Sequence, residues 1–156
     1  MVFYSPSRGQ LTFEAMFNDI VQYMKSAPGA NYKLIIGTDS QNRDYATFVT
    51  AVVVHRIGKG GRYYYTKQRD PKITSLRQRI FYEASLSLSV ASRIAEQLSK
   101  DGYSKMNVEI HLDVGQNGET KEMVREIIGM ILGSGFDAKI KPNSYGASKV
   151  ADKHTK

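Results

Sequence analysis

Cysteine is absent from the 156 residues, which excludes disulfide bonds, zinc sites with thiolate ligands and cysteine nucleophiles. The three histidines lack the spacing of paired zinc ligands, and no serine stands in a nucleophile-elbow motif. No apolar run approaches the ~18 residues that a membrane-spanning helix needs. The first residues, MVFYSPSRGQ, lack the charged-then-apolar pattern of a signal peptide. We therefore expect a cytoplasmic protein that does not enter a membrane.

The composition that is present is typical of a globular protein, with 41% hydrophobic and 24% charged residues. The chain is long enough to build one hydrophobic core. It contains no low-complexity stretch, internal repeat or linker-like segment, so we expect residues 1–156 to form a single domain.

Positive charge is concentrated in one segment. The chain carries 22 basic and 15 acidic side chains, a net charge of +7. Residues 56–79 alone hold one acid and eight bases, which matches the whole excess: Arg56, Lys59, Arg62, Lys67, Arg69, Lys72, Arg77 and Arg79. Tyrosines interleaved with these bases suit stacking on nucleobases, although packing in a core would explain them as well. The segment favours nucleic acid as the partner.

Hydrophobic periodicity predicts the order of elements. Steps of three and four residues indicate helices at 12–26, 74–100 and 119–132, and a last short helix is predicted at 146–154. Short apolar or β-branched runs indicate strands at 33–39, 47–57, 62–68, 106–112 and 136–140. The predicted class is therefore α/β, with a mixed five-stranded sheet, three antiparallel strands followed by two parallel ones, flanked by helices. An extra helix precedes the sheet. This order resembles the ribonuclease H-like fold, which places the first and fourth strands side by side.

Two aspartates are predicted at the ends of these strands. Asp39 ends the first strand and Asp113 ends the fourth. If the strands are neighbours ~4.8 Å apart, the two carboxylates could bridge divalent ions of a two-metal site. Oxygen ligands favour Mg²⁺ or Mn²⁺ over zinc. For either aspartate alone, capping of a turn or a helix is the commoner role.

Two further acids are candidates for the same site. Glu83 borders the apolar stripe of the helix predicted at 74–100, so it could face the sheet, or it could pair with Arg79 one turn earlier. Asp152 stands near the end of the sequence, where an exposed surface role is the simpler expectation.

Several motifs resemble those of the YkuK-like bacterial proteins, a family of ribonuclease H-like proteins. They are TFE at 12–14, GTDSQ at 37–41, YEA at 82–84 and VADKHTK at 150–156. The resemblance runs over nearly the full length and implies the ribonuclease H-like fold and a suspected nuclease activity. It implies that Asp39 and Asp113 bridge two Mg²⁺ or Mn²⁺ ions, with Glu83 and Asp152 completing the sites. His154 could then transfer a proton or help release product, or it could be an ordinary exposed histidine.

Two functions follow as hypotheses. The first is a metal-dependent nuclease that hydrolyses RNA, an RNA–DNA hybrid or branched DNA. The second is a catalytically silent nucleic-acid-binding module that retains the fold. The four carboxylates favour the nuclease, because a pure binder gains nothing from acids placed near phosphates.

Overall fold

The computed structural model describes residues 1–115, 118–141, 143–144 and 147–155. Its strands are β1 (Phe3–Ser5), β2 (Gly9–Leu11), β3 (Tyr32–Asn42), β4 (Ala46–Arg56), β5 (Gly61–Asp70), β6 (Asn107–His111) and β7 (Asp137–Lys139). Its helices are α1 (Phe13–Lys25), α2 (Leu76–Lys100), α3 (Lys121–Gly133) and α4 (Ala147–Thr155), and a short 3-10 turn spans Gly118–Thr120. Each predicted element is present to within a few residues. Gly146, where the last helix was predicted to begin, lies outside the described residues.

One mixed sheet organises the molecule. Its strands lie in the order β2-β1-β5-β4-β3-β6-β7. β3, β4 and β5 pair antiparallel, whereas β6 runs parallel to β3 and β7 parallel to β6. The first and fourth predicted strands, which are β3 and β6, are therefore neighbours, as the predicted fold requires.

The prediction of five strands was wrong, because the sheet has seven. The additional strands β1 and β2 form a hairpin at the N-terminus, and β1 pairs with the edge of β5 through Tyr4 and Tyr65. Each of these strands is three residues long. Three residues are too few to show the alternation by which a strand is recognised in a sequence.

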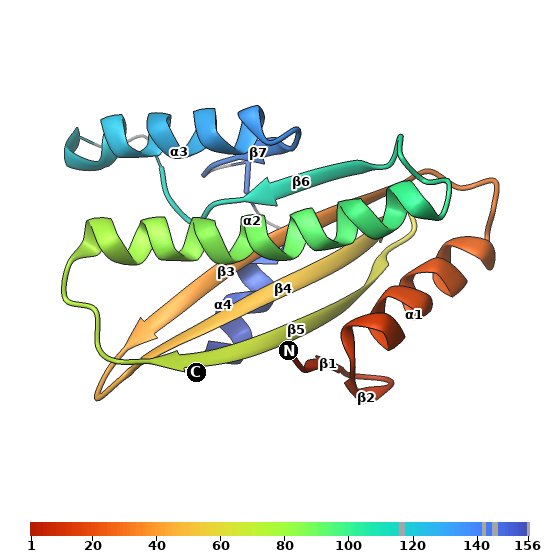
Figure 1. Ribbon diagram of the computed structural model, residues 1–156, viewed down its shortest axis with the longest axis horizontal. Helices are drawn as coiled ribbons and strands as arrows, with labels where there is room; N and C mark the ends of the chain where they lie inside the picture. The colour runs from red at the N-terminus through yellow and green to blue at the C-terminus, as the bar shows by residue number, and fades with distance from the viewer. Residues whose placement is uncertain (116–117, 142, 145–146, 156) are drawn as a thin grey trace.

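Two cores of unequal size lie on the two faces of the sheet. α1, α2 and α3 bury their apolar stripes in the larger core on one face, where Ile20, Ile94 and Ile127 are fully buried. α4 covers the other face, where Ala147 and Ala151 pack on Val49. Figure 1 shows α2 in front of the strands and α4 behind them. A site at the ends of the paired strands β3 and β6 can thus receive side chains from the helices on both faces of the sheet.

The helices begin where their sequences supply a cap. The Thr12 hydroxyl accepts a hydrogen bond from the Ala15 amide at the start of α1, and Ser75 does the same for Gln78 at the start of α2. No helix in the described part of the chain is long and apolar enough to span a membrane.

Candidate active site

The parallel pairing of β3 and β6 brings two aspartates to adjacent positions. Gly37 of β3 is aligned with His111 of β6. Two residues further along each strand direction stand Asp39 and Asp113, on the same face of the sheet because side chains alternate. Both aspartates are partly buried. Asp39 does not end its strand as predicted, because β3 continues to Asn42 in a long hairpin with β4.

α2 adds a third carboxylate, Glu83. The Ser40 hydroxyl donates a hydrogen bond of 2.5 Å to Glu83 Oε2. One turn further along the helix, the hydroxyl of Ser87 lies 2.8 Å from that of Thr38. Two polar residues on one stripe of α2 thus meet two alternate residues of β3. These contacts fix the position of the helix on the sheet and direct Glu83 to the strand that carries Asp39.

α4 brings the fourth carboxylate from the opposite face. Ala147 and Ala151 are fully buried against the sheet. The next residue, Asp152, is exposed, yet its carboxyl forms a hydrogen bond with that of Asp39. A hydrogen bond between two carboxyl groups requires a proton on one of them. The four acids that the sequence singled out therefore come from β3, α2, the end of β6 and α4 to one region of the molecule.

Burial and mutual repulsion raise the pKa of two of these acids. Burial, the hydrogen bond to Asp152 and the charge of Asp113 raise the pKa of Asp39 well above its ordinary value. Burial raises the pKa of Glu83 from 4.5 to about 7, and the charges of Asp39 and Asp113 act in the same direction. The hydrogen bond from Ser40 and the charge of Arg79 oppose that rise. Both acids therefore take up protons more readily than usual, and a divalent cation bound beside them would favour their charged forms instead.

Two cations lie beside the acids. Lys141, which follows β7, places its Nζ 3.0 Å from Asp113 Oδ1. Arg79 is close enough to lower the pKa of Glu83, and its Nε is buried without a hydrogen bond among the described residues. Sequence reasoning placed Arg79 in the basic segment and also considered it as a partner of Glu83, but it missed Lys141. The signal for Lys141 was a basic residue just after a strand predicted to run parallel to the strand of Asp113.

The carboxylate oxygens are of the type that a hard divalent ion such as Mg²⁺ binds. Their positions in this structure, however, are not those of metal ligands. The four acids offer only oxygen atoms, the ligands that Mg²⁺ and Mn²⁺ take. Among the described residues, no group of three histidine, aspartate or glutamate side chains is arranged to hold an ion. All four acids instead have partners within the protein: Asp113 pairs with Lys141, Glu83 accepts from Ser40, and Asp39 and Asp152 interact with each other. Rotation of these side chains would be needed to bring the oxygens together.

His154 lies in a different environment from these acids. Its ring stacks on Tyr65 with the centroids 3.8 Å apart, and its Nε2 lies 3.3 Å from the Tyr63 hydroxyl. Burial and the charges of Lys153 and Lys67 lower the pKa of His154. None of these contacts joins it to the four carboxylates, and its role in proton transfer or product release stays a prediction.

The basic segment is divided between two ends of the sheet. At one end, the Arg56 guanidinium stacks on Tyr23 at 4.1 Å and donates to the backbone carbonyl of the same residue. Arg62 forms an ion pair with Asp19 at 3.3 Å. Lys59 lies at this end too, in the turn between β4 and β5. Arg56 and Arg62 therefore hold α1 to the sheet, and none of the three is near the four carboxylates.

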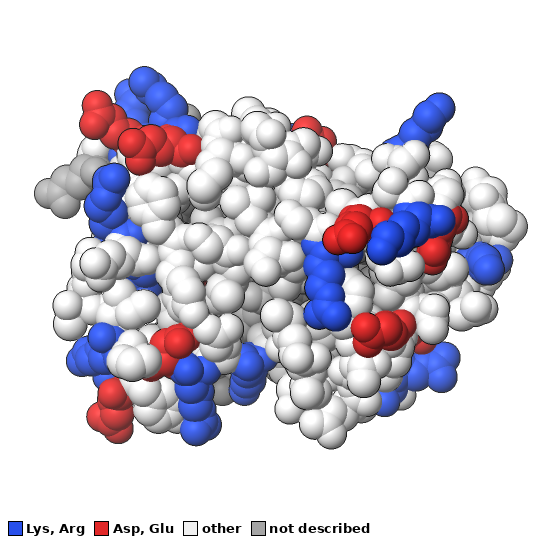
Figure 2. All heavy atoms as spheres, in the orientation of Figure 1, with Lys and Arg blue, Asp and Glu red and all other residues white. Residues whose placement is uncertain are grey.

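The rest of the segment lies near the other end. Lys67 and Arg69 are on the last half of β5, Lys72 follows that strand, and Arg77 and Arg79 are on the first turns of α2. Arg77 pairs with Glu126 at 3.5 Å. On the face shown in Figure 2, basic and acidic side chains are mixed at both ends and the middle carries little charge. The basic residues that are close in the sequence thus form separate clusters in the structure. The strands are ten or eleven residues long, so bases at their two ends lie ~30 Å apart.

Comparison with known proteins identifies the family. The family model described as Ribonuclease H-like matches residues 15–156. The chain is also 36% identical to "Uncharacterized protein YkuK" of Bacillus subtilis (strain 168), over 99% of this chain and 97% of the relative. No solved structure matches the chain significantly. With the strand order and the pairing of β3 with β6, these matches show that the chain belongs to the ribonuclease H-like family.

Proposed function

We propose that this protein is a nuclease that hydrolyses phosphodiester bonds of nucleic acid with the help of Mg²⁺ or Mn²⁺. The observation that carries the proposal is the approach of four carboxyl groups, from four separate elements, to the junction of β3 and β6. Divalent metal ions are typically associated with the ribonuclease H-like fold. The raised pKa of Asp39 and of Glu83 supports the same view, because a cation between the acids would lower both.

Each acid has a proposed role. Asp39 and Asp113, adjacent across the parallel strands, would hold the divalent metal together with Glu83 and Asp152, which reach the site from opposite faces of the sheet. When bound, the metal would supply a water of lowered pKa and stabilise charge on the leaving oxygen. Because the pKa of Asp39 is raised, ions would bind at this aspartate in competition with protons.

The nearby bases would position the substrate. Lys67, Arg69 and Lys72 lie toward the same end of the sheet as Asp39 and are suited to phosphate contacts. Arg79, whose charge lowers the pKa of Glu83, adds a further cation beside the acids. RNA, an RNA–DNA hybrid and branched DNA remain the substrate classes of this proposal.

The ion pair of Lys141 with Asp113 favours a second candidate function. If Lys141 neutralises Asp113 permanently, the chain would be a nucleic-acid-binding module that has the acids of a nuclease but takes up no metal. The two candidates differ in whether a divalent ion can displace the ammonium group from Asp113.

One experiment separates these candidates. The purified protein is incubated with labelled single-stranded RNA, RNA–DNA hybrid and four-way DNA junction, each in Mg²⁺, Mn²⁺ or EDTA. We expect cleavage of at least one substrate with metal and none in EDTA, and we expect Asp39→Asn and Asp113→Asn to abolish it. Asp137→Asn, an exposed aspartate on β7, is the matched control and should cleave normally. Binding without cleavage under every condition would refute the nuclease and leave the binding module.

A further inference from the structure

A pocket of about 380 Å³ lies on the face of the sheet that carries Asp39, at the turn of the β3–β4 hairpin. One wall comes from this hairpin and contains Gln41, Arg43 and Tyr45, and another comes from β5 and contains Lys67 and Arg69. The volume is within the range of pockets that hold small organic ligands, ~300–1,000 Å³. Sequence reasoning had singled out only the two bases of β5.

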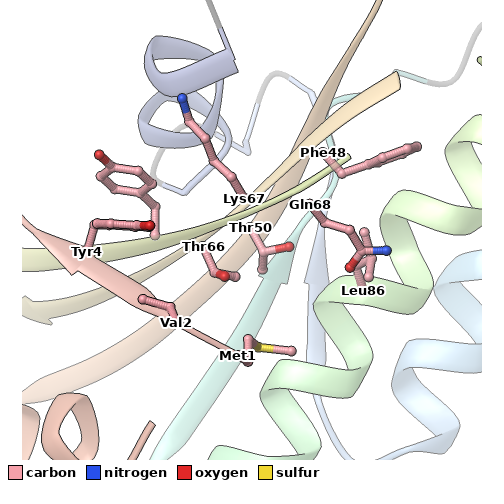
Figure 3. A pocket seen from close by; sticks show the side chains of 10 residues that line it. Met1, Val2, Tyr4, Phe48, Thr50, Thr66, Lys67, Gln68 and Leu86 are labelled. Atoms are coloured by element: carbon pink, nitrogen blue, oxygen red, sulfur yellow. The ribbon is translucent and has the colours of Figure 1, made fainter. Parts of the chain in front are cut away.

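The register of the strands places this pocket directly beside the candidate active site. Asp39, Val49 and Lys67 form one row across β3, β4 and β5, and Gln41, Thr47 and Arg69 form the next row on the same face. Successive rows on one face are ~7 Å apart. The pocket therefore begins at Lys67, in the row of Asp39, and continues into the next row. In Figure 3, Lys67 extends to the side of the sheet where α4 lies, whereas Gln68 and Leu86 lie on the side of α2.

The bases of this pocket are not neutralised within the protein. Among the described residues, no acidic side chain forms an ion pair with Arg43, Lys67 or Arg69. Arg62 at the other end of β5, by contrast, is paired with an aspartate. Three such cations against one lining carboxylate, that of Asp44, leave the pocket positively charged, which favours an anionic ligand such as a phosphate group.

An exposed aromatic ring completes the pocket. Tyr45 is 41% exposed, and the guanidinium of Arg69 lies 4.7 Å from the centroid of its ring. Phenol rings and guanidinium planes are the surfaces on which unpaired nucleobases stack. Gln41 and Asp44, which also line the pocket, offer hydrogen-bonding groups for the edge of a base.

From these observations we propose that the pocket holds one unpaired nucleotide of the nucleic-acid strand that enters the candidate active site. Its base stacks beside Tyr45 and Arg69, and its phosphate lies between Arg43 and Lys67. A base within a duplex is covered on both faces by its neighbours, so the pocket selects a single strand or a single-stranded end. The inference rests on the proposed function for the role of Asp39, but binding in the pocket requires no metal.

Binding measured in EDTA tests this inference separately from cleavage. Fluorescein-labelled single-stranded RNA, single-stranded DNA and a blunt duplex are titrated with wild type, Tyr45→Ala, Arg69→Gln and Lys105→Gln at several salt concentrations. Lys105 is the matched control, an exposed lysine just before β6 at the opposite end of the sheet. We expect Tyr45→Ala to bind single strands about fivefold more weakly or worse, since stacking of a base on an aromatic ring is lost. We expect Arg69→Gln to lower the slope of log K against log salt by about 0.7.

The duplex and the control decide the outcome. Tyr45→Ala should bind the blunt duplex as wild type does, and Lys105→Gln should behave as wild type throughout. A wild type that binds no single strand, a Tyr45→Ala variant with unchanged single-strand affinity, or an equal loss for the duplex would each overturn the inference. The RNA and DNA arms show whether the pocket distinguishes the sugar. If binding depends on Tyr45 but no substrate is cleaved in Mg²⁺ or Mn²⁺, the proposed nuclease is refuted and the nucleotide pocket is supported. If a substrate is cleaved but binding does not depend on Tyr45, the nuclease is supported and the pocket is refuted.

Discussion

Replacing Glu83 with glutamine should change how the stability of the metal-free protein depends on pH. In the folded protein the pKa of Glu83 is raised from 4.5 to about 7, with burial as the main cause. Between these two pH values the folded state binds more protons at this group than the unfolded state, so the free energy of unfolding falls as pH rises. The difference of about 2.5 pKa units corresponds to about 3 kcal/mol, at 1.36 kcal/mol per unit.

Glutamine has no proton to lose at this position, so the variant lacks this loss of stability. Its amide oxygen can still accept the hydrogen bond from Ser40. The free energy of unfolding of Glu83→Gln minus that of wild type should therefore increase by about 3 kcal/mol from pH 4.5 to pH 8. Any fixed cost of the substitution cancels, because the prediction concerns only the change in this difference with pH.

Urea denaturation in EDTA at several pH values measures this difference. Glu96→Gln is the matched control, because Glu96 lies on the same helix with its side chain 70% exposed. The control should give a difference that hardly varies with pH. A difference for Glu83→Gln that stays constant from pH 4.5 to 8 would show that the glutamate is not held in the buried, negatively charged setting described above.

Three further substitutions test other parts of the structure. Lys141→Gln removes the ammonium group from Asp113, so Mn²⁺ should bind more tightly when measured by calorimetry. The gain should be at most about fivefold, because a partly exposed ion pair contributes about 1 kcal/mol at most. Weaker Mn²⁺ binding by the variant would contradict this prediction. Ser87→Ala should lower the free energy of unfolding in urea by about 1 kcal/mol through a lost buried hydrogen bond, whereas the exposed Ser89→Ala should cost nothing; equal effects would show that the buried bond is unimportant. Arg56→Gln should lower the unfolding free energy by about 2 kcal/mol and leave the salt dependence of RNA binding unchanged, and a smaller salt slope would place this arginine on the nucleic acid.

Much of the fold follows from periodicity. The run of β-branched residues in β4 and the three-and-four spacing in α2 are clear signals because these elements are long. The same helical geometry showed that Glu83 borders the apolar stripe, and its contact with Ser40 agrees with that position. Tertiary pairing decided where β3 ends: the hairpin with β4 runs on to Asn42, which no local pattern around Asp39 indicated.

The details of the site depend on contacts between distant parts of the chain. Lys141 reaches Asp113 only because β7 lies parallel to β6, so its role required the three-dimensional arrangement of both strands. The basic residues are close together in the sequence, but the sequence does not show in which direction each strand runs. β4 and β5 are long antiparallel strands, which carry Arg56 and Arg69 to opposite ends of the sheet. The pocket around Tyr45 could not be predicted from the sequence either, because its walls come from two hairpins that meet only in the folded sheet.

The proposed nuclease requires that the four carboxylates bind a divalent ion together. Mn²⁺ is titrated into metal-free wild type, Asp39→Asn and the exposed-site control Asp137→Asn at pH 7, with free Mn²⁺ followed by electron paramagnetic resonance. Wild type and the control should bind Mn²⁺ and release protons as they do so, since Asp39 and Glu83 have raised pKa values, and Asp39→Asn should lose most of this binding. Absence of Mn²⁺ binding by wild type, or equal binding by Asp39→Asn, would contradict the proposed metal site.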